Sequence, residues 1–209
     1  MARYCGPVCK LCRREGAKLF LKGERCFTDK CSIERRQFPP GQHGPSGRIK
    51  FSEYGLQLRA KQRIKRVYGM AETAIRTTFE NAAKIKSGVG PRMLINIERR
   101  LDNVAYRMGV GISRAQARQF VTHNLIQVNG KKVKSPSYLV RKGDVIEVKT
   151  KEKEKDIFKQ NFEKVKRREV PNWLECDVEG MKATVKDLPV REDISADFNE
   201  RMVVELYSK

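Results

Sequence analysis

The polar and apolar pattern of residues 52–69 predicts an amphipathic helix. Ser52 is suited to cap its start, and Gly69 is suited to end it. The residues expected on the inner face are Tyr54, Leu58, Val67 and Tyr68. The residues expected to project into solvent are the basic ones, Arg59, Lys61, Arg63, Lys65 and Arg66.

The pattern predicts two further helices after Gly69. Residues 71–88 place four apolar side chains on one face, Ile75, Phe79, Ala82 and Ala83, and Gly88 is the expected stop. A third helix opens at Pro91, and its apolar residues recur every three or four positions as far as Met108. We place a bend or a domain boundary near Glu98 within this run.

Residues 99–122 contain the end of one helix and the whole of the next. The first ends at Gly109, and Ser113 starts the second, with Gln116 placed for a capping box. The second helix is expected to turn Ala117, Phe120 and Val121 inward and Arg114 and Arg118 outward.

The period then changes from helix to strand. Ile126 and Val128 alternate with polar residues, and the dipeptide Asn129-Gly130 favours a hairpin turn. Residues 145–149, VIEVK, follow the turn sequence RKGD and predict another strand. Two short helices followed by a hairpin sheet predict a compact αα-β unit with a basic outer face.

The remaining residues predict one helix and three short strands. Residues 153–168 form an amphipathic pattern that uses Ile157, Phe158, Phe162 and Val165. Beyond Pro171, the pieces WLECDV, MKATV and RMVVELYS are typical of strands.

The charge balance identifies the class of partner. The chain has 45 Lys and Arg against 25 Asp and Glu, a formal net charge of +20. Such an excess repels itself in a compact state unless a polyanion neutralises it, so we expect nucleic acid. Residues 1–69 hold 17 basic side chains against 5 acidic ones, whereas residues 175–205 hold 9 acidic against 4 basic. We expect no membrane partner and a cytoplasmic location, because no long apolar run or secretory signal is evident.

Four cysteines near the N-terminus have the spacing of metal ligands. Cys9 and Cys12 form a C-x-x-C pair, and Cys26 and Cys31 form a second short-spaced pair. Such pairs bring four thiolates to one tetrahedral ion, so we expect structural zinc, with an iron–sulfur cluster as the second possibility. Two disulfides or unliganded buried thiols are the alternatives. Cys5 can replace one of the four ligands, and Cys176 is expected to be a packed bystander.

These patterns together predict an α+β fold. A four-cysteine metal knuckle and a helical domain precede an αα-β nucleic-acid-binding module with a small antiparallel sheet. The expected division is 1–48 for the knuckle and a Pro/Gly connector, 49–98 for the helical domain and 99–165 for the module. Residues 166–209 are expected to pack back on the body.

Four stretches carry a resemblance to a known family. They are LDNVAYRMGVGISRAQARQFVTHNLIQVNG, FPPGQHG, DVEGMK and VELYSK. They resemble the bacterial-type small-subunit ribosomal protein S-four family, in its metal-binding, four-cysteine form. The resemblance implies a primary rRNA-binding protein that docks on a helical junction in the 5′ domain of small-subunit rRNA and nucleates assembly. It also implies a place beside ribosomal protein S-five, near the path by which mRNA enters, and an influence on translational accuracy.

The candidate RNA-binding residues are basic side chains and the tyrosines and glutamines beside them. Arginine holds phosphate oxygens in two directions, and tyrosine can stack on unpaired bases or pack in the core. The candidates are Arg3, Tyr4, Lys10, Arg13, Arg14, Arg35, Arg36, Lys50, Tyr54, Arg59, Lys61, Gln62, Lys65, Arg66, Tyr68, Arg99, Arg114, Gln116, Arg118, Lys131 and Lys132.

Two other classes of function compete with a ribosomal role. An enzyme that carries the same αα-β module needs a separate catalytic domain, and no segment here has a phosphate loop or a catalytic constellation. We therefore expect no enzymatic activity. A stand-alone RNA chaperone or translational regulator that uses the same module is the alternative.

Overall fold

The computed structural model describes residues 4–47, 50–85, 88–149, 152–165, 170–194 and 197–208. The chain divides into two compact units. The first unit consists of Met1–Met93 and Ala196–Lys209, and the second consists of Leu94–Ser195. Among the described residues, no helix is long and apolar enough to cross a membrane.

The first unit is built from helices. They are α1 (Cys9–Glu15), the 3-10 helix η1 (Gly23–Phe27), α2 (Ser32–Arg35), α3 (Glu53–Val67), α4 (Glu72–Ala83) and α9 (Glu200–Tyr207). The expected cap of α3 is confirmed, because Ser52 Oγ accepts a hydrogen bond from the Gly55 amide at 3.2 Å. The expected stop is also confirmed: Gly69 has a φ of 60°, and the Met70 amide donates to the Lys65 carbonyl at 3.0 Å.

Helix α4 largely follows the sequence pattern. Ile75, Phe79 and Ala82 are buried, as expected, whereas Ala83 is exposed. The helix ends at Ala83, before the expected stop at Gly88.

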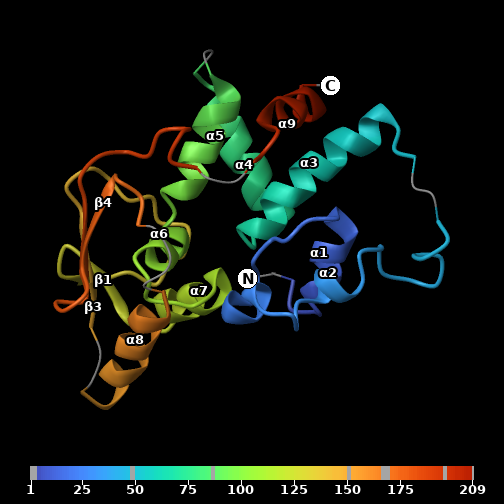
Figure 1. The fold of residues 1–209 in the computed structure, drawn as a ribbon. Helices are drawn as coiled ribbons and strands as arrows, with labels where there is room; N and C mark the ends of the chain where they lie inside the picture. The colour runs from blue at the N-terminus through green and yellow to red at the C-terminus, as the bar shows by residue number, and fades with distance from the viewer. Residues whose placement is uncertain are drawn as a thin grey trace. The chain divides into compact units, whose positions relative to one another are not determined.

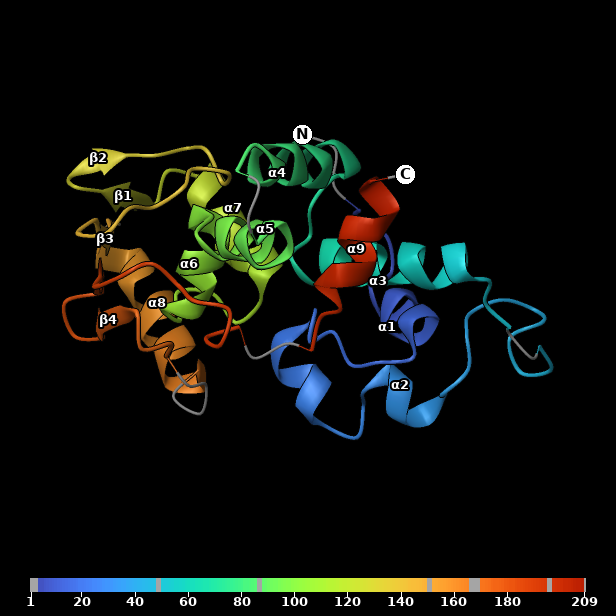
Figure 2. The ribbon, with the colours of Figure 1, turned by 90° about the horizontal axis from the view of Figure 1, so that it is seen from above.

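The terminal segment RMVVELYS, for which we predicted a strand, forms helix α9. Asn199 caps it by accepting from the Met202 amide at 3.3 Å. The valine pair favours a strand by propensity, but Val203, Leu206 and Tyr207 recur at helical spacing and give the segment one packing face. Helix α9 packs along α3, and the Tyr207 ring stacks on Phe79 of α4 with centroids 4.8 Å apart. Figures 1 and 2 both show α9 beside these two helices.

The long helical pattern after Pro91 is interrupted, as we expected near Glu98. Helix α5 (Val89–Glu98) spans the boundary between the units, and α6 (Leu101–Arg107) follows after two residues. The break arises because the backbone here bonds to the segment 136–140 instead. The Leu101 amide donates to Tyr138 O at 2.8 Å, and the Val140 amide donates to Arg99 O at 3.0 Å.

The second unit contains a β-sheet, with five strands among the described residues. The strands are β1 (Ile126–Val128), β2 (Lys131–Lys132), β3 (Val145–Val148), β4 (Leu174–Asp177) and β5 (Lys182–Val185). Their order is β2-β1-β3-β5-β4, and all neighbours are antiparallel. The predicted hairpin turn is confirmed, with φ values of 50° at Asn129 and 75° at Gly130. The segment 166–209 therefore contributes two strands to this unit and α9 to the other.

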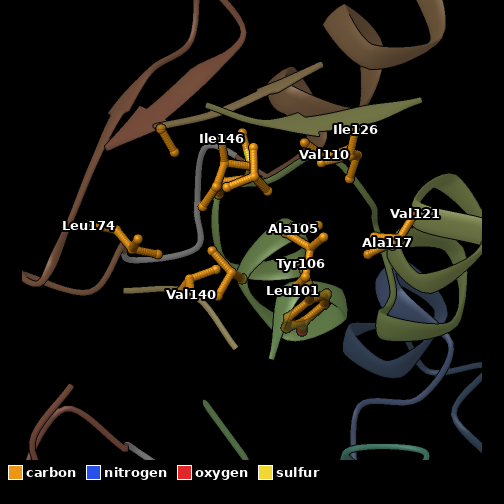
Figure 3. Packing of buried hydrophobic residues seen from close by; sticks show 14 of the residues in the cluster. Leu101, Ala105, Tyr106, Val110, Ala117, Val121, Ile126, Val140, Ile146 and Leu174 are labelled. Carbon is orange, nitrogen blue, oxygen red and sulfur yellow. The ribbon is translucent and has the colours of Figure 1, made fainter. Parts of the chain in front are cut away.

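The core of the second unit lies between the sheet and helices α6 and α7 (Arg114–Thr122). Figure 3 shows Leu101, Ala105, Ala117, Val121, Ile126 and Ile146 pointing into this core. Helix α8 (Glu152–Val165) adds Phe158 and Phe162, and Asn161 Nδ2 donates to the Val110 carbonyl at 2.8 Å. Ile157, which we expected on the inner face, is 50% exposed. The side chain of Val165 lies outside the described residues.

Candidate RNA interface and cysteine cluster

One buried acid organises a group of arginines in the first unit. Arg59, Arg63 and Arg66 lie on one face of α3, because they are four and then three residues apart. Glu15, at the end of α1, accepts from Arg59 Nη1 at 3.0 Å and from Arg66 Nη1 with the same oxygen, and its side chain is 3% exposed. We call Glu15, Arg14, Arg59, Arg63 and Arg66 the Glu15 cluster.

The Glu15 cluster carries more positive charge than its one acid can balance. Burial raises the pKa of Glu15, and the guanidinium groups of Arg66, Arg59, Arg14 and Arg63 act in the opposite direction. Two guanidinium groups therefore bond one carboxylate, and two more lie near enough to act on its charge. The cluster is suited to bind further anions, and phosphate is the anion whose oxygens match the donor fork of arginine.

Lys61 does not project into solvent as predicted. Its ammonium group is bound to Glu72, which also accepts from Lys65 Nζ at 2.8 Å and from the Tyr207 hydroxyl at 3.3 Å. Lys61 is only 8% exposed, and its Nζ lies 5.6 Å from the centroid of the Tyr207 ring. Lys61 is therefore held inside the first unit and is not positioned to contact RNA.

The inner face of α3 is rotated relative to the prediction. Its buried stripe runs through Gln57, Lys61 and Ile64 to Tyr68. Two of these residues are polar, which concealed the stripe from an apolar-periodicity argument. Tyr54, expected to be inside, is 59% exposed, whereas Tyr68 packs against Phe198 and is 5% exposed. Tyr54 therefore remains a candidate for base stacking, and Tyr68 does not.

Arg13 holds the Pro/Gly connector. Its guanidinium donates to Phe38 O at 3.0 Å and to Pro39 O at 3.3 Å, and it lies 4.9 Å from the centroid of the Phe38 ring. A side chain with two carbonyl partners and a ring beneath it has an internal role. Arg13 therefore positions the connector.

The other candidates of the first unit differ mainly in exposure. Arg3 lies outside the described residues, and Gln62 is half-buried. The exposed ones are Tyr4, Lys10, Arg14, Arg35, Arg36 and Lys50.

A second buried acid fixes an arginine of the αα-β module. Asp102 is bonded by Arg100 through Nε at 3.1 Å and Nη2 at 2.9 Å, and by Arg118 Nη1 at 2.6 Å. The side chains of Asp102 and Arg118 are 6% and 14% exposed. Arg118 thus lies against the surface of the unit in one orientation.

Arg114 is fixed by a neighbouring network. Its Nε donates to Asn103 Oδ1 at 3.0 Å, and its guanidinium lies 4.3 Å from the centroid of the Tyr106 ring. Asn103 in turn donates to the carbonyl and the carboxylate of Glu98. We predicted that Arg114 and Arg118 project outward, but both are half-buried and held, because Asn103 and Asp102 of α6 bond them.

The predicted Ser113 cap of α7 is confirmed, whereas Gln116 bonds the amide of Ile112 and not that of Ser113. Ser113 Oγ accepts from the Gln116 amide at 3.3 Å, and Gln116 Oε1 accepts from the Ile112 amide at 2.8 Å. The amide oxygen of Gln116 therefore stabilises the start of α7.

Three candidates remain near the sheet. Lys131 and Lys132 are exposed on the edge strand β2. Arg99 is half-buried and donates from Nε to Val140 O at 3.0 Å, and burial, together with the charge of Arg141, lowers its pKa.

The four predicted metal ligands do not form an ion-holding set among the residues that the structure describes. Cys12, Cys26 and Cys31 are buried and Cys9 is half-buried, and all four are free thiols. No group of three or more His, Cys, Asp or Glu side chains in the described ranges is arranged to hold a metal. The four-cysteine knuckle that the spacing predicts therefore stays a prediction.

The surroundings of the thiols are nevertheless those of sulfur ligands. The Lys22 amide donates to Cys26 Sγ at 3.4 Å, and the Leu19 backbone bonds to Cys12. Burial raises the pKa of Cys12 and Cys26, and the neighbouring cysteines raise them further. The donor type, the burial, the amide hydrogen bonds and the mutual proximity of the thiols fit a metal centre. Of the other two cysteines, Cys5 is exposed, and burial raises the pKa of Cys176 to about 11.

The acids that organise the arginines were absent from our candidates. Glu15 directly follows one pair of arginines in the sequence, Glu98 directly precedes another, and Asp102 lies two residues after that second pair. A single acid within a basic, helix-forming segment was the sequence signal that could have identified these residues. Whether such an acid is buried depends on the tertiary structure, which the sequence pattern does not show.

Comparison with known proteins identifies the family. A profile described as the ribosomal protein S4/S9 N-terminal domain matches residues 3–98, and one described as the S4 domain matches residues 99–146. The chain is 54% identical to small ribosomal subunit protein uS4 of Citrifermentans bemidjiense over 209 residues, all of both chains. It is 53% and 52% identical to the proteins of that name from Geobacter sp. strain M21 and Desulforapulum autotrophicum, again over both full lengths. The chain belongs to the small ribosomal subunit protein uS4 family.

Proposed function

We propose that this protein is a non-enzymatic structural constituent of the small ribosomal subunit that binds small-subunit rRNA. Its family membership supports the ribosomal role. The observation that carries RNA binding is the Glu15 cluster, in which two arginines bond one buried carboxylate and two more lie near it. The whole chain also has an excess of positive charge, with a formal net charge of +20.

Arginines that are held in place suit the recognition of folded RNA. The grooves of A-form RNA hide its base edges, so a protein reads the shape of a junction through phosphates and 2′-hydroxyls. Arg59, Arg66, Arg114 and Arg118 are each fixed by an acid or an amide. Less side-chain entropy is then lost when a phosphate binds.

Salt-titrated binding tests this proposal. Arg14→Gln/Arg63→Gln removes two charges of the Glu15 cluster without removing a bond to Glu15. Arg76→Gln/Arg201→Gln is the matched control, because it removes two charges at exposed positions on α4 and α9. We expect the slope of log affinity against log salt to fall by about 0.7–0.9 per lost phosphate contact in the first variant. The control should keep the wild-type slope.

Two results would contradict the role. Equal slopes for wild type and the Glu15-cluster variant would show that the cluster does not contact phosphate. Equal affinity for small-subunit rRNA and for random transcripts of the same length would refute specific binding. Co-sedimentation separates the alternative, because a free chaperone or regulator leaves the small subunit at high salt and a structural constituent stays.

We also propose that Cys9, Cys12, Cys26 and Cys31 bind a structural zinc ion, with an iron–sulfur cluster as the second possibility. Their spacing, their burial and the amide hydrogen bonds to two of the sulfurs support this. A bound ion would fix the loop that joins the two cysteine pairs.

The metal proposal is tested on protein purified from its native host. We expect about one zinc per chain by elemental analysis and protection of the four thiols from alkylation until a chelator is added. Cys9→Ser should lose the metal, and Cys176→Ser is the matched control that should keep it. Protein without zinc or iron, with all four thiols alkylated in the folded state, would remove the proposal.

We propose that the acidic C-terminal stretch faces ribosomal protein S-five. Glu175, Asp177 and Glu179 are exposed on the β4–β5 hairpin, which supports an interaction with a basic partner. Cross-linking from Glu179→Cys in assembled subunits tests it, and absence of a product with that protein would contradict it. Docking in the 5′ domain, nucleation of assembly, proximity to mRNA and an influence on accuracy remain predictions from the family resemblance.

A further inference from the structure

Two phenylalanine rings stack on each other in the loop of residues 16–30, which lies between Cys12 and Cys31 and includes Cys26. The centroids of Phe20 and Phe27 are 5.0 Å apart, and the ring planes differ by 30°. The rings are not covered: Phe20 is 39% exposed and Phe27 is 71% exposed, more than any other large hydrophobic residue in the described ranges. Single exposed apolar residues are ordinary on protein surfaces. A stacked pair that is open to solvent is a preformed flat surface.

The backbone holds this ring pair in place. Leu19 precedes Phe20 and is 3% exposed, and Cys26 precedes Phe27 and is 7% exposed. Each exposed ring is thus anchored by a buried neighbour. Phe20 also has a φ of 51°, a left-handed conformation that residues with a large side chain rarely adopt and that persists where the surroundings enforce it.

Cations accompany the rings. Lys22, Arg25 and Lys30 are exposed in the same loop. Arg25 Nε donates to the Lys30 carbonyl at 3.3 Å, which places this guanidinium beside Lys30. Within the described residues, neither lysine ammonium has an ion-pair partner. The combination of a flat aromatic surface and unpaired cations matches a nucleotide, which offers a π face and a phosphate. An apolar protein partner would have to desolvate these charges.

We propose that Phe20 and Phe27 form a stacking platform for an unpaired base of small-subunit rRNA. The base stacks on the free face of Phe27, and Lys22, Arg25 and Lys30 contact the adjacent phosphates. Phe20 supports Phe27 from behind. This inference rests on the proposed function, and it adds a base contact to an interface otherwise made of phosphate contacts.

The test compares substitutions of Phe27 in the full chain. Phe27→Ala should weaken binding to a small-subunit rRNA transcript roughly 5- to 150-fold, the range for loss of one stacked base. The salt slope should stay at the wild-type value, because no phosphate contact is removed. Phe27→Trp should keep the affinity, and Phe27→Leu, which is apolar but not aromatic, should lose most of it. Ile85→Ala removes another exposed apolar side chain of the same unit and is the matched control.

The outcomes separate the two proposals. If wild type does not prefer small-subunit rRNA, the proposed function fails. If the wild type prefers small-subunit rRNA and Phe27→Ala binds it equally well, only the stacking platform is refuted. Full affinity of Phe27→Leu for the rRNA transcript would refute stacking. So would a Phe27→Ala variant that binds the transcript normally and is defective only in assembled subunits. Far-UV circular dichroism of each variant checks that the fold is retained, and Phe27→Trp gives a positive result that misfolding cannot imitate.

Discussion

Asp102 is a buried carboxylate with two arginine partners, so its charge is open to a direct test. Asp102→Asn keeps the size of the side chain and removes the negative charge. Arg100, whose side chain is 8% exposed, and Arg118, at 14%, then keep their positive charges with a neutral partner. The second unit should lose stability because water cannot fully hydrate these two groups.

The expected loss follows from the burial of the three side chains. Removal of one partner of a buried ion pair typically costs about 3–5 kcal/mol. Asparagine keeps one acceptor oxygen for Arg100 or Arg118, so we expect the lower end, about 3 kcal/mol. With an m value of about 2 kcal/mol per molar urea, the unfolding midpoint should fall by about 1.5 M.

Trp173 provides the readout. It is the only tryptophan in the chain, it is 4% exposed, and it belongs to the core of the second unit. Its fluorescence during urea unfolding therefore follows this unit. Asp187→Asn is the control, because it makes the same chemical change in an ion pair with Lys142 whose side chains are 67% and 63% exposed. Exposed pairs contribute little, so this midpoint should barely change.

A midpoint for Asp102→Asn equal to that of Asp187→Asn would refute the reasoning, because buried and exposed acids would then be equivalent. Arg118→Gln provides an independent check. If Asp102 and Arg118 interact directly, the two substitutions together should destabilise the unit by less than the sum of their separate effects.

Three further predictions concern local features. Ser52→Ala should lower the stability of the first unit by about 1 kcal/mol and speed amide exchange at Gly55, because the cap of α3 is lost; unchanged exchange would contradict this. Gly130→Ala should destabilise the second unit by about 1–2 kcal/mol through its φ of 75° alone, since a Cβ meets no atom within 4 Å. Partial burial raises the pKa of the Cys176 thiol to about 11, against 9.0 ordinarily, so the folded state favours the neutral form. Its contribution to stability should decline from about pH 9 to pH 11, and the difference in unfolding free energy between wild type and Cys176→Ala should decrease over that window.

The sequence predicted those parts of the fold that local chemistry determines. The cap at Ser52, the stop at Gly69 and the Asn129-Gly130 turn all follow from backbone preferences of a few residues. Helix α9 was misassigned because two adjacent valines favour a strand, whereas its packing against α3 is a contact between residues far apart in the chain.

The candidate site was less accessible to sequence reasoning. A periodicity argument sorts residues by polarity, so it placed Lys61 outside, although an acid and a tyrosine ring provide a buried place for it. The arginines were expected only to point outward. Their fixed orientations depend on Glu15, Asp102 and Asn103, and only the folded chain brings these residues to them.

The composition of the first unit affects the order in which the protein folds during its own synthesis. Tyr207 of α9 stacks on Phe79, yet during translation the two residues are added to the chain roughly 6–25 s apart at ordinary elongation rates. The second unit is one continuous stretch of chain and can fold within that interval. We therefore expect the αα-β module to fold first during synthesis, before α9 can pack on α3. A stop codon just before α9 would leave α3 without this packing partner and would destabilise the N-terminal part of the chain.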